Sequence, residues 1–268
     1  MNSDELKQNW RRGAVNIEAE TAAWDSAAEE YVFEEKINFR DEPFLRFMAE
    51  KTEIRPDMRS LDVGCGAGAY SVALAGRVAQ ADGLDLSPRM VELGMDYARK
   101  HGIRNLSLRV ADWGSLDETQ LGDKYDIVFA HTTPAVADYD TLVKMCAVSR
   151  GCCFLCKPAR RTDKVFDALR ELAGLKKSPA GDDSVAYTFA ALWGLGYGPE
   201  LSYTKTVWLP ERRLEDAEKW FIGRLRGRET LSAETETRLK EYLRDISVDG
   251  LVKEEINTTL VNIYWKTV

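Results

Sequence analysis

A glycine-rich stretch in the first third of the chain reads Leu61-Asp62-Val63-Gly64-Cys65-Gly66-Ala67-Gly68-Ala69-Tyr70. Its three glycines stand at every second position, after an acidic residue and a β-prone run. Glycine lets backbone N–H groups approach a ligand that a Cβ atom would push away. If residues 59–63 form a strand and residues 70–79 a helix, this loop is the first turn of a βαβ unit that binds a nucleotide.

Length, charge and cysteine usage limit the class of protein. The 268 residues suffice for one large α/β domain with a core that needs no disulfides. The formal net charge of −7 argues against a nucleic-acid partner, which usually requires a basic face. Four of the five cysteines lie within residues 146–156, too close together for a disulfide framework. We find no signal peptide or membrane-spanning run, and therefore expect a cytoplasmic protein with no membrane partner.

Strands and helices alternate along the middle of the chain. The strands are expected at residues 59–63, 83–86, 106–110, 125–130 and 152–156. The helices are expected at residues 70–79, 88–101, 116–121 and 139–148. Such alternation with short links predicts an α/β fold with a doubly wound, parallel sheet and right-handed connections.

The flanking segments have a different pattern. Residues 1–55 have a polar, helical pattern. The later elements are expected to be helices at 163–173 and 183–195, a strand at 201–208, two amphipathic helices within 210–251 and a strand at 257–265. We predict three parts, which are an N-terminal helical cover (1–55), a core (56–208 and 253–268) and a helical insertion (209–252).

Acidic residues follow the expected strands at positions that suit a nucleoside. Asp85 stands 85 − 64 = 21 positions after Gly64, where a carboxylate can accept hydrogen bonds from both ribose hydroxyls. Asp112 directly follows the third strand and can accept from an exocyclic amine, while Trp113 beside it can cover a ring face.

His131, one of only two histidines, directly follows the fourth expected strand. Open α/β sheets bind ligands at the carboxyl ends of their strands. The ordinary pKa of histidine suits a general base, so His131 is a candidate catalytic residue as well as a candidate cofactor contact.

Together these segments resemble the class I, Rossmann-like methyltransferases that use S-adenosylmethionine. The matching segments are residues 62–70, 83–90, 110–113 and 125–131. The resemblance implies a seven-stranded, mostly parallel sheet whose last strand is antiparallel, a strand that residues 257–265 would supply. It also implies S-adenosyl-L-methionine as the cofactor.

The resemblance assigns roles to individual residues. In this family the glycine loop contacts the methionyl part of the cofactor, and acids matching Asp85 and Asp112 bind the ribose and the adenine amine. A residue matching Leu86 packs on the adenine, and Tyr31 resembles an N-terminal element that closes over the cofactor. The implied cofactor-binding residues are Tyr31, Asp62, Gly64, Cys65, Gly66, Asp85, Leu86, Asp112, Trp113 and His131. No metal site is expected, because the Cys152–Cys156 cluster has no suitably spaced partners.

Two other functions stay open at this point. An NAD(P)-dependent oxidoreductase would match Gly64-x-Gly66-x-x-Ala69 together with Asp85. Against it, Asp62 suits an ammonium and a sulfonium better than a pyrophosphate, and no tyrosine is followed by a lysine four positions later. A non-catalytic regulatory protein that binds the cofactor would keep the same pocket residues.

The sequence also favours a small-molecule substrate. The loop His131-Thr132-Thr133-Pro134-Ala135 lacks the Asn/Asp-Pro-Pro-aromatic motif of the amino-methyltransferases that act on nucleic acids. The N-terminal helices and the insertion are expected to cover the substrate pocket, and the acceptor atom stays open between O, N, S and C. Basic residues of the insertion are interpreted mainly as a solvated helix face: Arg212, Arg213, Lys219, Arg224, Arg226 and Arg228.

Overall fold

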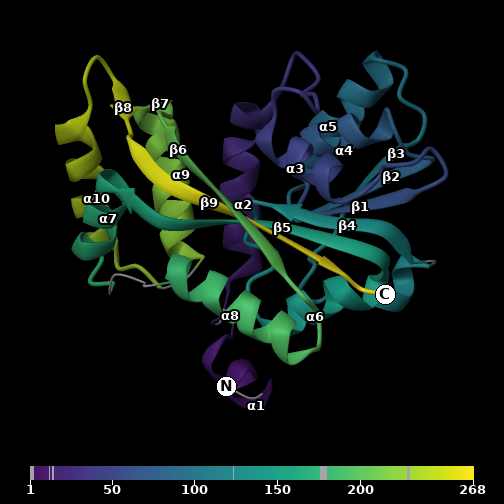
Figure 1. The fold of residues 1–268 in the computed structure, drawn as a ribbon. Helices are drawn as coiled ribbons and strands as arrows, with labels where there is room; N and C mark the ends of the chain where they lie inside the picture. The colour runs from purple at the N-terminus through teal and green to yellow at the C-terminus, as the bar shows by residue number, and fades with distance from the viewer. Residues whose placement is uncertain (1–2, 12, 14, 123, 176–179, 228–229) are drawn as a thin grey trace.

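The computed structural model describes residues 3–11, 13, 15–122, 124–175, 180–227 and 230–268. Its main sheet has seven strands, which are β1 (Arg59–Val63), β2 (Gln80–Asp85), β3 (Leu106–Val110), β4 (Tyr125–His131), β5 (Ser149–Asp163), β6 (Glu200–Trp208) and β9 (Ile256–Lys266). Their order is β3-β2-β1-β4-β5-β9-β6 (Figure 1). Only β9 runs antiparallel to its neighbours β5 and β6 in this sheet. The predicted α/β fold with an antiparallel last strand is confirmed.

Each expected strand is present, but two features of the sheet differ from the sequence pattern. Strand β5 extends well beyond residues 152–156, because β9 pairs with it from Cys152 to Asp163. The pairing shifts register between Ala159 and Thr162, where Arg160 has a φ of +50°. Strand β9 lies inside the sheet, so the edge on its side is β6, an earlier strand in the chain, and the other edge is β3.

Helices cover both faces of the sheet. One face is covered by α1 (Ser3–Asn9), α6 (Tyr139–Val148) and α8 (Ala180–Gly194). The other face is covered by α3 (Pro43–Lys51), α4 (Ala69–Ala75) and α5 (Pro88–Lys100). Successive residues of β4 point to opposite faces, so Val128 belongs to the first core and Phe129 to the second. Burial on both sides explains the apolar run of residues 127–130 in this strand.

A separate helical lobe extends from the carboxyl end of the sheet (Figure 1). It comprises α2 (Ile17–Ala27), the 3-10 helix η1 (Ala28–Tyr31), α7 (Lys164–Leu172), α9 (Leu214–Arg226) and α10 (Ala233–Ile246). Its core includes Phe166, Phe221 and Leu239. The short strands β7 (Glu211–Arg213) and β8 (Leu251–Lys253) pair beside α9 and were not predicted. The division of the chain into cover, core and insertion stays a prediction.

Two helices differ from the prediction, one in its type and one in the residue where it begins. The helix expected at residues 116–121 is instead a short 3-10 helix, η2 (Glu118–Leu121), which begins with the side chain of Asp117 accepting from Thr119 N. The helix expected at residues 183–195 is α8, which begins a few residues earlier. Within the described part of the chain, no helix combines the length and the apolar character that crossing a membrane requires.

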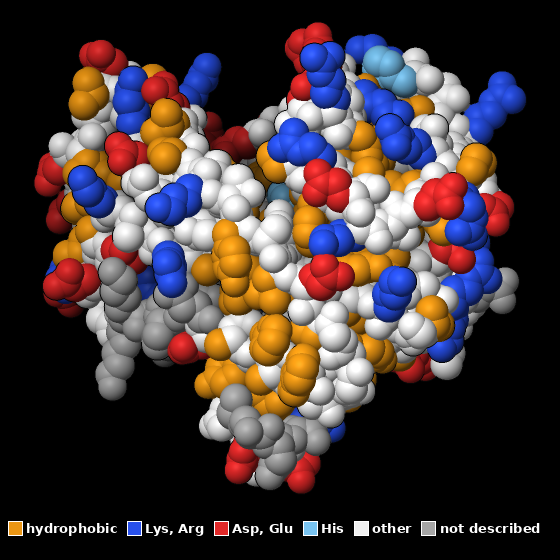
Figure 2. Space-filling model, in the orientation of Figure 1, with side chains coloured by type: hydrophobic (Ala, Val, Ile, Leu, Met, Phe, Trp, Pro, Cys, Tyr) orange, Lys and Arg blue, Asp and Glu red, His pale blue; other side chains and the backbone are white. Residues whose placement is uncertain are grey.

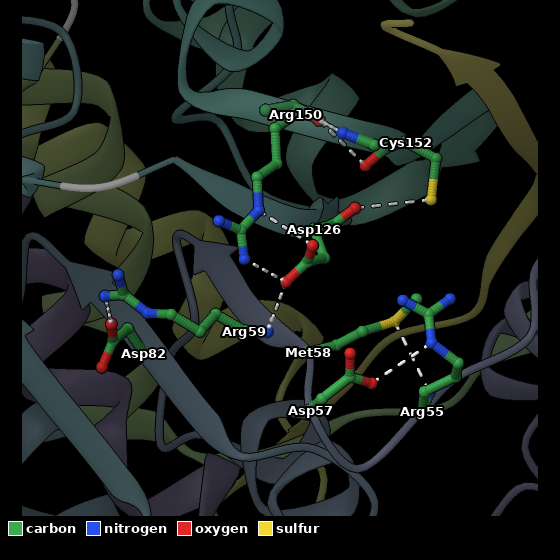
Figure 3. A network of polar contacts seen from close by, with 10 residues as sticks. Arg55, Asp57, Met58, Arg59, Asp82, Asp126, Arg150 and Cys152 are labelled. Atoms are coloured by element: carbon green, nitrogen blue, oxygen red, sulfur yellow. Dashed lines mark hydrogen bonds and ion pairs between the residues drawn. The ribbon is translucent and has the colours of Figure 1, made fainter.

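Polar contacts join three strands at their amino ends (Figure 3). The carboxylate of Asp126 on β4 accepts from the backbone N–H of Arg59 on β1 at 2.8 Å. It also accepts from two nitrogens of the Arg150 guanidinium on β5, each at 2.9 Å. The hydrogen bonds from Arg150 are the largest cause of the lowered pKa of Asp126. Asp126 thus fixes the central strands at the edge opposite to the one that binds ligands.

We expect Asp126→Asn to lower the free energy of unfolding by about 1–2 kcal/mol, because it weakens these charge-assisted hydrogen bonds near the surface. The pKa of Asp126 is lower in the folded state, so its contribution is full above the ordinary aspartate pKa and is lost as the pH falls through the lowered value. Urea denaturation at neutral pH should show the difference, and at pH ~3 it should be smaller. An equal difference at both pH values would contradict this account.

Candidate cofactor and substrate cavities

All ten residues that the sequence proposed for cofactor binding line one cavity of about 330 Å³. They come from the carboxyl ends of β1, β2 and β4, from the loop after β3 and from η1. Additional lining residues, which the sequence did not single out for the cofactor, include Glu20, Trp24, Tyr70, Met90 and Thr133. The parallel strands bring these distant segments together, because their carboxyl ends meet at one edge of the sheet.

The glycine loop has a conformation that other residues rarely adopt. Gly64, Gly66 and Gly68 have φ angles of +72°, +55° and +81°. The backbone N–H groups of Gly64 and Cys65 both donate to the Leu84 carbonyl, at 2.8 and 2.9 Å. A Cβ atom at Gly64 would lie 2.0 Å from Oγ1 of Thr133. Both the positive φ and the close approach of the Thr133 loop therefore require glycine here.

Asp85 joins the glycine loop to the start of α5. Its Oδ2 accepts from the Gly66 N–H at 2.7 Å, and its Oδ1 accepts from the Ser87 N–H at 2.9 Å. Burial raises the pKa of Asp85, while these backbone donors oppose the increase. Ser87 caps α5 by accepting from Met90 N, so the cap does not need the Asp85 carboxylate.

Asp62 lies beneath the glycine loop and is buried. Its Oδ2 accepts from the hydroxyl of Ser71 on α4 at 2.8 Å. Burial, with a smaller contribution from the charge of Asp85, raises the pKa of Asp62 to about 8. A cationic group in the adjacent cavity would lower this pKa again, so the position fits a ligand that carries positive charge.

The loop after β3 places Asp112 and Trp113 differently. Oδ1 of Asp112 accepts from the Gly114 N–H at 3.0 Å, and Asp112 lies at the cavity wall. The indole of Trp113 is buried and donates from Nε1 to the Thr141 carbonyl at 3.1 Å. Core packing therefore holds the Trp113 ring, and its role of covering an adenine stays a prediction.

A chain of polar contacts passes through His131. The Tyr70 hydroxyl donates to Oε1 of Glu42 at 3.0 Å and lies 3.2 Å from Nε2 of His131. Since the single hydroxyl proton goes to Glu42, we assign the hydrogen of His131 to Nε2. Its Nδ1 then accepts from the hydroxyl of Thr132, 3.2 Å away.

This environment makes His131 a weak base. Burial lowers the pKa of His131 to about 3, so the imidazole is neutral at physiological pH. Both ring nitrogens have side-chain partners, Tyr70 at Nε2 and Thr132 at Nδ1. The low pKa and these contacts make His131 a poor candidate for the general base. They favour a role in which His131 holds Tyr70 and Thr132 in place.

A second, larger cavity of about 1240 Å³ adjoins the first. The residues common to both are Glu20, Trp24, Tyr31, Tyr70, His131, Thr132, Thr133 and Pro134. The larger cavity also takes lining residues from α9 and from the ends of β5, β6 and β9. Figure 2 shows the molecule hollowed between the helical lobe and the covered sheet.

The larger cavity contains charged residues that the sequence interpretation missed. Arg212 is buried rather than solvated, and its guanidinium donates to both carboxylate oxygens of Glu30, at 2.7 and 2.6 Å. It also contacts Glu254, whose pKa burial raises to about 7 against the opposing charge of Arg212. Arg224 lines the same cavity, with its guanidinium 5.1 Å from the Trp220 ring.

The interpretation of the basic residues as a solvated face is therefore wrong for Arg212. Arg213, Lys219 and Arg226 are exposed, as that interpretation requires, and Arg228 lies outside the described residues. Arg212 forms an ion pair with Glu30, 182 positions away in the sequence. No local pattern could have indicated this pairing, which joins the insertion to the N-terminal segment.

Comparison with known proteins agrees with this geometry. Residues 54–177 match the family described as "Methyltransferase domain". An uncharacterized Haemophilus influenzae protein is 24% identical over 163 residues, which span 59% of this chain and 58% of that protein. A 2-heptyl-1-hydroxyquinolin-4(1H)-one methyltransferase of Mycobacteroides abscessus is 30% identical over 95 residues, 35% of this chain and 41% of that enzyme. These matches thus span less than two thirds of either curated relative.

The precorrin-6y C5,15-methyltransferase of Geobacter metallireducens has a similar fold, with a TM-score of 0.50 and 13% identity. The likeness covers 88% of this chain and 94% of that one. Residues 54–177 thus match a methyltransferase-domain family, and the fold is that of the class I, Rossmann-like methyltransferases. The family match implies S-adenosylmethionine as the cofactor, and the glycine loop, Asp62 and Asp85 fit it. The match thus favours a methyltransferase over the oxidoreductase alternative.

We expect Asp85→Asn to weaken the binding of S-adenosylhomocysteine by about 1.5–3 kcal/mol, the usual contribution of a hydrogen bond to a charged group. The variant should still fold, because the residue ends a strand. Isothermal titration calorimetry measures the loss. Asp96→Asn is the matched control, since Asp96 contacts Arg99 on the exposed side of α5. Equal affinity for both variants would remove Asp85 from the site.

Gly64→Ala should impair both folding stability and cofactor binding, because the new Cβ meets Thr133 in a backbone conformation that alanine avoids. The control is Gly194→Ala at the end of α8, where a Cβ meets nothing within 4 Å. Thermal melts with and without S-adenosylhomocysteine compare the two. A Gly64→Ala protein that melts and binds like the control would contradict the described loop geometry.

Proposed function

We propose that this protein transfers a methyl group from S-adenosylmethionine to a small organic molecule bound in the larger cavity. The observation that carries the proposal is the junction of the two cavities, where Tyr31, Tyr70 and His131 line both. A cofactor in the smaller cavity would have the larger one beside it. A cavity of about 1240 Å³ has room for a sizeable molecule, since ligand pockets usually measure roughly 300–1,000 Å³.

The protein's main contribution in this proposal is alignment. The cofactor supplies a methyl group that its sulfonium already activates. Asp62, Asp85 and the glycine loop would fix the cofactor, while the residues of the larger cavity orient the acceptor in line with the methyl group and exclude water. A dedicated base is needed only for an acceptor that arrives protonated, so the weak basicity of His131 is compatible with turnover.

Charge and cavity shape support a small molecule over a nucleic acid. The chain carries a formal net charge of −7, and the larger cavity has acidic and basic residues in its lining rather than a continuous basic face. A nucleic-acid backbone usually requires a basic face, whereas an enclosed cavity of this kind suits a small molecule. We also propose that the protein works in the cytoplasm, where thiols such as the buried Cys153 and Cys156 stay reduced.

S-adenosylhomocysteine should raise the melting temperature, because a ligand that binds only the native state stabilises that state by mass action. NADH should leave the melting temperature unchanged. Incubation with methyl-labelled S-adenosylmethionine and a library of small metabolites should then give a labelled product. Stabilisation without any product, or labelling of RNA or DNA in place of small molecules, would contradict the proposal and support a regulatory or nucleic-acid role.

A further inference from the structure

Lys157 is a buried lysine of β5 in the wall of the larger cavity. It follows Cys156 on β5, which is in register with His131 on β4. The Thr132 N–H donates to the Cys156 carbonyl at 2.9 Å, which is the last backbone contact between β4 and β5 in this direction. Lys157 is the next residue of β5 after this contact. Lys157 lines the larger cavity together with Trp10 and Val136.

The ammonium group of Lys157 is buried with little to neutralise it. Only 7% of the residue is exposed. Its Nζ donates to the Val136 carbonyl at 2.7 Å and lies 5.6 Å from the centre of the Trp10 ring. A protonated lysine has three N–H donors, and among the described residues Lys157 has no carboxylate within ion-pair distance.

The acidic residue whose charge acts on Lys157 also serves as a helix cap. The charge of Asp138 raises the pKa of Lys157, against the larger effect of burial, which lowers that pKa to about 8. However, Oδ1 of Asp138 caps α6 by accepting from the backbone N–H and the hydroxyl of Thr141, at 2.9 and 2.6 Å. At neutral pH Lys157 is thus mostly a buried cation without an ion-pair partner among the described residues, and the loss of its hydration is poorly compensated.

Aromatic rings flank this cation. Trp10 and Tyr187 stack with their ring centres 6.2 Å apart and their planes 19° from parallel. Both residues line the larger cavity, as do Tyr31 and Tyr70 at the junction. Trp10 itself is buried, but the rings of Tyr31, Tyr70 and Tyr187 are at least partly exposed. A flat aromatic molecule can pack against these tyrosines, and its anionic group would then meet Lys157 at the cavity wall.

We propose that the methyl acceptor is an aromatic carboxylic acid and that Lys157 binds its carboxylate. This inference rests on the proposed function, because it identifies the class of substrate for the same cavity. The ligand carboxylate supplies the acceptors that Lys157 lacks, and its charge offsets the desolvation of the ammonium. The alternative is a purely structural lysine that ties β5 to the loop after β4 through Val136. The two accounts differ in whether Lys157 recognises anions.

The test uses 2-naphthoate and its neutral counterpart 2-naphthamide as probes. Both are titrated by calorimetry into the full chain saturated with S-adenosylhomocysteine. The wild type should bind naphthoate at least about tenfold more tightly than naphthamide, and Lys157→Met should abolish this preference by weakening naphthoate alone. Lys205→Met is the matched control at an exposed position on β6, outside the cavity lining, and should keep the preference.

Lys157→Arg keeps the charge and should keep the preference for naphthoate, so it covers the case in which Lys157→Met fails to fold. The inference is overturned if the wild type binds neither probe, binds both equally, or keeps its preference after Lys157→Met. Failure of the proposed function looks different. If the proposed function is wrong, the protein binds a carboxylate through Lys157 but transfers a methyl group to no acceptor. If it transfers methyl groups to neutral acceptors alone, only the assignment of an aromatic acid as substrate is refuted.

Discussion

The structure of the cofactor site depends on a single carboxylate that holds two loops. Asp85 accepts from Gly66 in the glycine loop and from Ser87 at the start of α5, so both loops are fixed relative to the end of β2. The glycine loop can adopt its course because Gly64 has a positive φ and no Cβ to meet Thr133. The loop after β4 can therefore close over it, which brings His131 and Thr132 to the junction of the cavities.

The local parts of this arrangement could be predicted from the sequence. Apolar runs and short links gave the strands of the sheet, and the spacing from Gly64 to Asp85 indicated a nucleoside site. The parallel pairing of β1, β2 and β4 then brings the predicted residues to one edge. The full length of β5 could not be predicted in this way, because it depends on pairing with β9, which is distant in the sequence.

The larger cavity was much harder to predict, since distant residues complete it. Tyr70 contacts Glu42 and His131, which are 28 and 61 positions away, and Arg212 pairs with Glu30 across 182 positions. These pairs have no periodic signal, and each partner alone looks like an ordinary surface residue. The same holds for the helical lobe, whose separate core forms only when α2, α7, α9 and α10 meet.

In the proposed enzyme, cofactor and acceptor occupy two adjoining cavities that meet at Tyr31, Tyr70 and His131. A crystal structure with bound S-adenosylhomocysteine tests this arrangement most directly. The account predicts the ribose hydroxyls within hydrogen-bonding distance of Asp85 and the sulfur at the junction, facing the larger cavity. A sulfur turned away from that cavity, or a cofactor bound elsewhere on the molecule, would contradict the claim.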